Sequence, residues 1–272
     1  MTDVVIATGE TDARAAQAVE EHHAQMSGTL TALVERLVAA AGRADVADAR
    51  EARTRLEAWC RDDLLPHALA EERTLYPAAR RTVEGRLLVE GMVSEHRVIE
   101  GLVRSLTGVD DPVRAAANAT ALRALFEAHL TKENDLLIPL LLRTPGASVA
   151  DLLGGMRELL GSRAGTVHDL DREDETTGGC GEGHTCSCGE TDPVGYPELD
   201  ARSIPHAIRH ATIFGALAAV EPGSGLVLLA PHDPLPLLAQ IADRWPGRFG
   251  VDYFERGPQT WRLALERSDA RQ

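Results

Sequence analysis

The chain has 272 residues, 44% of them hydrophobic and 4% aromatic, and a formal net charge of −14. This length is about twice that of a common single domain, so we expect two domains. The negative charge argues against nucleic acid or an anionic membrane as the main partner. No apolar run reaches the ~18–20 residues that a bilayer span needs, and the first ten residues lack the pattern of a signal peptide. We therefore predict a soluble, cytoplasmic protein that binds neither nucleic acid nor membrane.

The first part of the chain, residues 11–161, shows helical periodicity. In its first segment one apolar line steps by four and three through Val19, His23, Met26, Leu30, Leu33 and Leu37. Asp111 and Pro112 form an N-cap and first-turn pair. Long helices are expected near residues 19–37, 46–80, 85–106 and 112–137, with a short fifth helix near 149–160. Short connections between them predict a mainly α fold, an antiparallel four-helix bundle.

Histidines and glutamates interrupt the apolar stripes of these helices. The second and fourth helices each carry a histidine and a glutamate four residues apart, hence on one face, and the first and third each carry a stripe histidine. The six residues are His67 and Glu71, His129 and Glu133, His23 and His96. Such side chains are costly to bury unless they are paired or bind metal. We predict two metal ions with bridging carboxylates, and imidazole with carboxylate suits iron, manganese or zinc.

This pattern resembles the hemerythrin-like (HHE cation-binding) family over about residues 11–161. The motifs that carry the resemblance are Glu21-His22-His23-Ala-Gln-Met26, His67-Ala-Leu-Ala-Glu71-Glu72, Glu95-His96 and His129-Leu-Thr-Lys-Glu133. The resemblance implies two iron ions with an oxo or hydroxo bridge. It makes the four histidines terminal ligands and Glu71 and Glu133 bridging ligands. His22 is the alternative to His23 on the first helix.

The third helix departs from the family pattern. Oxygen-carrying members place two histidines four apart there, whereas this chain has His96 and Glu100. Glu100 is either an extra carboxylate ligand or a solvated residue. Four histidines and two bridging glutamates leave an open position on each iron, which favours reaction with O2, NO or peroxide over simple O2 storage. Tyr76 either supplies a proton or an electron near the site or only packs there.

The segment of residues 162–197 has the composition of a Gly/Cys-rich acidic linker. It contains Cys180, His184, Cys186 and Cys188, which are enough ligands for one tetrahedral zinc or iron site. The spacing is tighter than in common zinc motifs. A redox disulfide or exposed thiols are the alternatives.

Residues 198–268 predict a small α+β two-layer domain of order β-α-β-α-β-β, in which the first two strands are parallel. The segment is similar to the small sulfur-carrier fold, and more closely to an uncharacterised domain often attached to hemerythrin-like proteins. Where sulfur carriers have Cys-Pro, this chain has Ile204-Pro205, so persulfide transfer is lost. Asp233-Pro234 is expected to cap the second helix. His206, His210 and His232 are candidates for a third metal or ligand site, or are surface imidazoles.

The sequence thus favours a cytosolic di-iron protein that binds or reduces O2, NO or H2O2, with a redox protein as a further partner. Reduction of NO or peroxide would make it an enzyme. Two alternatives remain open: iron donation with repair of iron–sulfur clusters, and redox or oxygen sensing without turnover.

Overall fold

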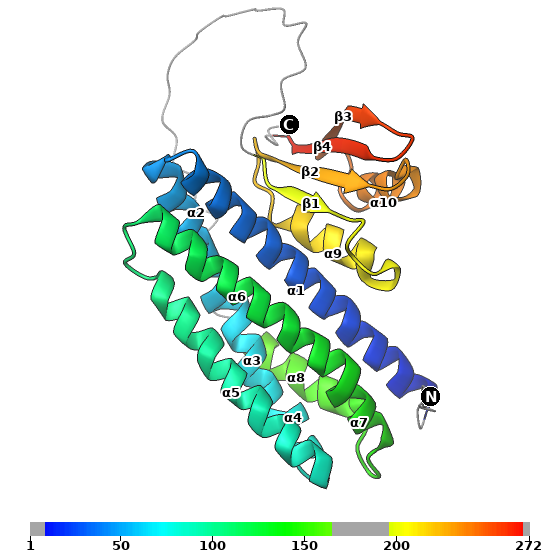
Figure 1. The fold of residues 1–272 in the computed structure, drawn as a ribbon. Coiled ribbons are helices and arrows are strands. Elements are labelled where there is room, and N and C mark those ends of the chain that lie inside the picture. Colours follow the sequence, from blue (N-terminus) through cyan, green and yellow to red (C-terminus); the bar gives the residue numbers. More distant parts are fainter. Residues whose placement is uncertain (1–8, 165–195, 269–272) are drawn as a thin grey trace, which may run out of the picture.

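Figure 1 shows the computed structural model, which describes residues 9–164 and 196–268. A long helical part is followed by a small part built on a four-stranded sheet. The mainly α fold with a small α+β domain is therefore confirmed. Within the described residues, no helix is long and apolar enough to cross a membrane.

The helical part is a bundle in which α1 packs against α2 and α6, and α5 packs against α6. Side-chain caps start several of its helices: Asp45 accepts from the N–H of Asp48, Thr82 from that of Gly85, and Asp111 from those of Val113 and Arg114. The predicted cap at Asp111 is thus confirmed. The helices are α1 (Glu10–Gly42), α2 (Val46–Trp59), α3 (Leu65–Arg73), α4 (Leu75–Ala79), α5 (Val83–Leu106), α6 (Pro112–Lys132), α7 (Ile138–Arg143) and α8 (Val149–Ala164).

The second and fourth helices are not continuous, contrary to the periodicity-based prediction. Each contains a π-helical turn, η1 (Cys60–Leu64) and η2 (Glu133–Leu137). Pro66 and Pro139 follow these turns at the second position of α3 and α7. A proline has no N–H for the carbonyl four residues earlier, so the preceding α-helical hydrogen-bond pattern cannot continue through it. Because a π turn adds a residue to one turn, it rotates the following side chains relative to the helix before it.

The C-terminal part has two layers, as predicted. Its sheet has the order β1-β2-β4-β3, with β1 parallel to β2 and the other pairs antiparallel. Buried residues of α9 and α10 share one apolar cluster with the sheet. The elements are β1 (Glu198–Asp200), α9 (His206–Ala218), β2 (Gly225–Ala230), α10 (Leu235–Arg244), β3 (Phe249–Arg256) and β4 (Trp261–Arg267).

The predicted cap at Asp233-Pro234 is wrong. Helix α10 begins at Leu235, its N-cap residue is Pro234, and no side chain caps it. The Asp233 carboxylate instead accepts a hydrogen bond of 3.0 Å from the Tyr253 hydroxyl on β3. The Asp233 side chain therefore bonds a residue 20 positions away instead of capping α10 as the local sequence predicts.

Helix α9 lies between the sheet and α1 (Figure 1), and glycines make its contact with α1 very close. A Cβ atom at Gly28 would lie 1.9 Å from the Thr212 carbonyl oxygen, and one at Gly215 would lie 2.0 Å from that of Gln25. The Thr29 hydroxyl donates to the Gly215 carbonyl at 2.9 Å. Only glycine permits two helix backbones to approach this closely, so the two parts have a defined docking geometry.

The glycine crossing can be tested with Gly215→Ala in the full chain. We expect α9 to move away from α1, because the new methyl group would overlap the α1 backbone. Hydrogen exchange should then increase at Gln25–Thr29 and in α9, while the rest of the bundle keeps its protection.

Gly91→Ala on α5 is the matched control, because a Cβ atom there meets nothing within 4 Å. Alanine is the better helix former by about 1 kcal/mol, so this variant should be at least as stable as the wild type. Unchanged exchange at the α1–α9 contact in Gly215→Ala would show that the domains do not dock through this crossing.

Candidate metal centre

The predicted ligands lie between two apolar clusters of the bundle. On α1, one cluster ends at Val19 and the other begins at Met26, with His23 between them. On α5, Met92 and Ile99 similarly flank the turn that carries His96. The polar side chains thus form a layer across the bundle with apolar core on both sides, where solvent cannot compensate their charge.

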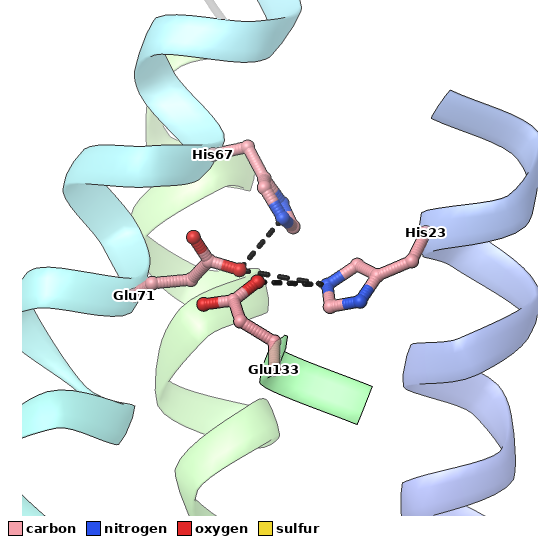
Figure 2. Close-up of side chains that lie close together, drawn as sticks. All are labelled: His23, His67, Glu71 and Glu133. Atoms are coloured by element: carbon pink, nitrogen blue, oxygen red, sulfur yellow. Dashed lines mark ion pairs between the residues drawn. The ribbon is translucent and has the colours of Figure 1, made fainter. Parts of the chain in front are cut away.

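The first group of converging side chains is His23, His67, Glu71 and Glu133 (Figure 2). Oε1 of Glu71 lies 2.8 Å from Nε2 of His67 and 3.5 Å from Nε2 of His23. Oε2 of Glu133 lies 3.7 Å from the same His23 nitrogen. Each of the four side chains is at most 4% exposed.

The second group is Glu71, His96 and His129. The Nε2 atoms of the two histidines face each other at 3.0 Å, and Oε2 of Glu71 lies 3.6 Å from that of His96. The Tyr76 hydroxyl lies among them: it donates to Oε1 of Glu133 at 2.8 Å and lies 3.2 Å from the His96 nitrogen. Tyr76 is therefore at the site itself, and its side chain is only 1% exposed.

Both glutamates span the two groups. Glu71 turns Oε1 to His23 and His67, and Oε2 to His96. Glu133 turns Oε2 to His23, and Oε1 to Tyr76 and to His129, whose Nε2 lies 3.6 Å away. A carboxylate that directs one oxygen to each of two positions is suited to bridging two cations.

Several buried polar atoms at the centre lie close to one another, Nε2 of His67 and Oε1 of Glu71 at 2.8 Å among them, but have no partner in hydrogen-bond geometry among the described residues. They are Nε2 of His23, both ring nitrogens of His67, Oε1 of Glu71 and Oε2 of Glu133. Buried polar atoms are rarely left unsatisfied, since each costs about 1–3 kcal/mol. Nitrogen and oxygen donors that converge without protein partners fit a bound cation.

Outer hydrogen bonds fix the orientation of three of the histidines through their Nδ1 atoms. The acceptors are Asn134 for His23 at 2.7 Å, Glu72 for His96 at 2.8 Å and Glu95 for His129 at 2.9 Å. Lys132 in turn pairs with Glu95. A neutral imidazole that donates from Nδ1 presents a lone pair at Nε2, which is the atom that faces the centre in each case.

The electrostatics of the metal-free centre show that it attracts positive charge. Burial opposes protonation of His129, but the carboxylates of Glu133, Glu71 and Glu95 outweigh it and raise the pKa of His129 to about 8. The pKa of His23 is also raised, by Glu71 and Glu133 against the effect of burial. Burial alone would raise the pKa of Glu71, yet His67 and His23 hold it well below its usual value.

The other candidate ligands lie elsewhere. His22 is exposed, and its ring is tilted by 55° against that of His67 with centroids 5.1 Å apart, whereas the alternative ligand His23 lies in the centre. The Glu100 side chain is 51% exposed and pairs with Arg104 on the same helix. His206, His210 and His232 belong to no metal-capable group of the described residues. Cys180, His184, Cys186 and Cys188 fall outside those residues.

Sequence reasoning missed most of the outer acceptors. The sequence patterns give Asn134 no role and include Glu95 only as part of a motif, and they indicate for Glu72 either an outer partner or a surface charge rather than a ligand. Each is next to a ligand in the sequence, after Glu133, before His96 and after Glu71. Yet each supports a histidine on another helix, so the pairing depends on the fold. A polar residue flanking a ligand was the available signal.

Comparisons with known proteins agree with this site. Residues 14–141 match the family model of the hemerythrin HHE cation binding domain, and residues 198–267 match that of an uncharacterized conserved protein, DUF2249. The similarity to the small sulfur-carrier fold is not confirmed. No curated protein and no solved structure matches the chain.

Two glutamates of equal charge but different position test the centre. Glu133→Gln should lower the metal content of the purified protein, because it removes a buried carboxylate that faces both groups of ligands. Glu100→Gln should bind as much metal as the wild type, because the Glu100 carboxylate lies on the surface.

Metal analysis after dialysis against a weak chelator measures both variants. Equal metal content in Glu133→Gln and wild type would contradict the bridging role of Glu133. An equal loss in both variants would mean that overall negative charge, rather than this centre, binds the metal.

Proposed function

Because the chain carries a hemerythrin HHE cation-binding domain at residues 14–141, we propose that it is a di-iron protein that binds or reduces a small ligand, O2, NO or H2O2. The observation that carries the proposal is the shared position of Glu71 and Glu133, each of which directs one oxygen to either group of histidines. One metal ion needs no such pair of spanning carboxylates, whereas two ions do.

Each metal position has its own pair of histidines. His23 and His67 would hold one iron, His96 and His129 the other, and the two glutamates both. Imidazole with carboxylate suits iron, which also serves redox chemistry with small oxygen and nitrogen ligands. When bound, the pair of irons supplies open coordination positions and up to two electrons.

The protein supplies orientation, dryness and a hydrogen-bond donor. Asn134, Glu72 and Glu95 keep the histidines turned to the centre through hydrogen bonds. The apolar clusters on both sides exclude bulk water. Burial and the neighbouring carboxylates raise the pKa of Tyr76 far above its usual value, so the hydroxyl keeps its proton and remains a hydrogen-bond donor at the centre.

Anaerobic metal analysis with optical spectra tests the proposal. We expect about two irons per chain and absorption changes on addition of one of the three ligands. Binding alone would appear as a stable new spectrum, and reduction as consumption of the ligand with oxidation of the iron. Wild-type protein that holds no iron after anaerobic reconstitution would refute the di-iron proposal. Rapid loss of iron to an apo-cluster acceptor, without ligand reaction, would favour iron donation.

Tyr76→Phe tests the proposed hydrogen-bond donor. Because the phenyl ring fills the same space and all six candidate ligands remain, the variant should keep its iron content. Consumption of peroxide or NO should slow by about 10²-fold or more, the usual effect of removing one hydrogen-bond donor aimed at the reacting group. An unchanged rate would leave Tyr76 with a packing role only.

Redox sensing is a second candidate, which the α1–α9 contact favours. The Gln25 carbonyl contacts α9 at Gly215, and Gln25 is two residues from His23. A change at His23 is therefore positioned to alter how the C-terminal domain docks. Hydrogen exchange of α9 in the fully reduced and fully oxidised protein should then differ, and identical patterns would exclude sensing through this contact.

A further inference from the structure

A cavity of about 530 Å³ lies between the bundle and the C-terminal domain. Helices α1 and α6 form one wall, and β1, the loop after it and α9 form the other. We call it the interdomain cavity; its lining includes Ser27, Thr31, Glu127 and Thr131 from the bundle, and Asp200 and Ser203 from the C-terminal domain. Ligand sites occur preferentially at such domain interfaces.

Hydroxyl groups in the wall present acceptor atoms to the cavity. Thr31, Thr131, Ser203 and Thr212 each donate their hydroxyl proton to a backbone carbonyl of their own segment. A hydroxyl that has used its only proton can offer just lone pairs to a further partner. These positions therefore favour an occupant that donates hydrogen bonds.

The charged side chains of the wall point to the same kind of occupant. Four carboxylates line the cavity, against one guanidinium, Arg123, which pairs with Glu35. Asp200 and Glu198 pair with Arg202 and Arg262, neither of which lines the cavity. Glu127 forms no ion pair with any described residue, and Oγ1 of Thr31, whose proton goes to the Ser27 carbonyl, lies 3.5 Å from its Oε1. The Arg123 guanidinium acts on this carboxylate from a distance but is paired with Glu35, so Glu127 remains available to a cation.

The cavity reaches a predicted metal ligand. His23 and Asn134, which share a 2.7 Å hydrogen bond, line it together. The His23 side chain is 2% exposed, and its unpartnered Nε2 faces Glu71 and Glu133 in the centre, as Figure 2 shows. One imidazole therefore separates the cavity from the centre.

We infer that the interdomain cavity takes up hydrated divalent metal ions and passes them to the buried centre at His23. Water molecules of a hydrated ion donate hydrogen bonds, which the hydroxyl and carboxylate oxygens of the wall accept. Anions are disfavoured there. The inference rests on the proposed function, since it assumes that the centre binds metal.

A second cavity, of about 850 Å³, also reaches the centre, at His67 on the other side of α1. Its lining mixes charges: Arg61, Asp62 and Asp63 occur together with Trp59 and Pro66. Arg61 pairs with Asp62, so the lining has an excess of one carboxylate over guanidinium groups, against an excess of three in the interdomain cavity. This cavity supplies a matched control, because Asp63 is a carboxylate beside a route that we do not assign to metal.

The experiment measures the rate of Fe2+ uptake by the metal-free full chain under anaerobic conditions, with a chromogenic chelator to quench aliquots. We expect Glu127→Gln to slow uptake about threefold or more and Glu127→Lys about tenfold or more, the latter at the lower end of the 10–10³-fold range of electrostatic steering. Asp63→Asn and Asp63→Lys should load at the wild-type rate. Added salt should slow Fe2+ uptake more in the wild type than in Glu127→Gln, because salt screens the Glu127 charge and the variant no longer carries that charge.

The outcomes separate this inference from the proposed function. If the wild-type protein binds no Fe2+ at equilibrium, the proposed function is wrong. Normal iron content with equal uptake rates in Glu127→Lys and wild type overturns the uptake route alone. Slower uptake in the Asp63 variants but not in the Glu127 variants would assign loading to the cavity beside His67 instead.

Discussion

The structure depends on the need to compensate two carboxylates and four imidazoles buried in one layer of an apolar bundle. Hydrogen bonds to protein satisfy only part of this layer, and Glu71 and Glu133 each keep an oxygen with no hydrogen-bond partner. An uncompensated buried ion costs several kcal/mol. Shared protons can meet this cost in the metal-free chain, which is why the pKa values of His23 and His129 are raised. Two divalent cations would meet it better, because each oxygen and nitrogen then faces a positive charge without competing for a proton.

The same layer ties the helices together. Three hydrogen bonds join a histidine to an acceptor on another helical segment. Asn134 in η2 accepts from His23 on α1, Glu72 on α3 from His96 on α5, and Glu95 on α5 from His129 on α6. Each acceptor therefore connects the helix that carries it to a neighbour. Nδ1 of His67 has no such partner within the part of the chain that the structure describes. The π-helical turns η1 and η2 occur just before or at the ligand-bearing turns of the same two helices. These turns set the side-chain directions that let His67 and Glu133 face one centre.

Much of this arrangement could be predicted from local sequence patterns. Helical periodicity located the bundle, and the four-residue spacing of His67 with Glu71 predicted a shared face. The π turns escaped this reasoning, because periodicity is blind to one extra residue in a turn, although Pro66 and Pro139 marked their ends. Asp233 illustrates a different failure: its local role as a helix cap was replaced by a contact with Tyr253 on a distant strand. The hydrogen bonds from the histidines to Asn134, Glu72 and Glu95 could not be predicted for a similar reason. Each joins two helices, so it can be recognised only when the relative positions of the helices are known.

The position of the C-terminal domain follows from α1, the helix that carries His23. One to two turns after that histidine, Gly28 on α1 lets the backbone of α9 come close. Gly215 on α9 does the same for the backbone of α1. Residues of both domains then surround the interdomain cavity, whose lining includes His23 and Asn134. A domain that only needed to be attached would not require backbone contact at this point of the bundle. Its placement makes the C-terminal domain part of the surroundings of the candidate metal centre, because the stretch of α1 that carries His23 also docks the domain.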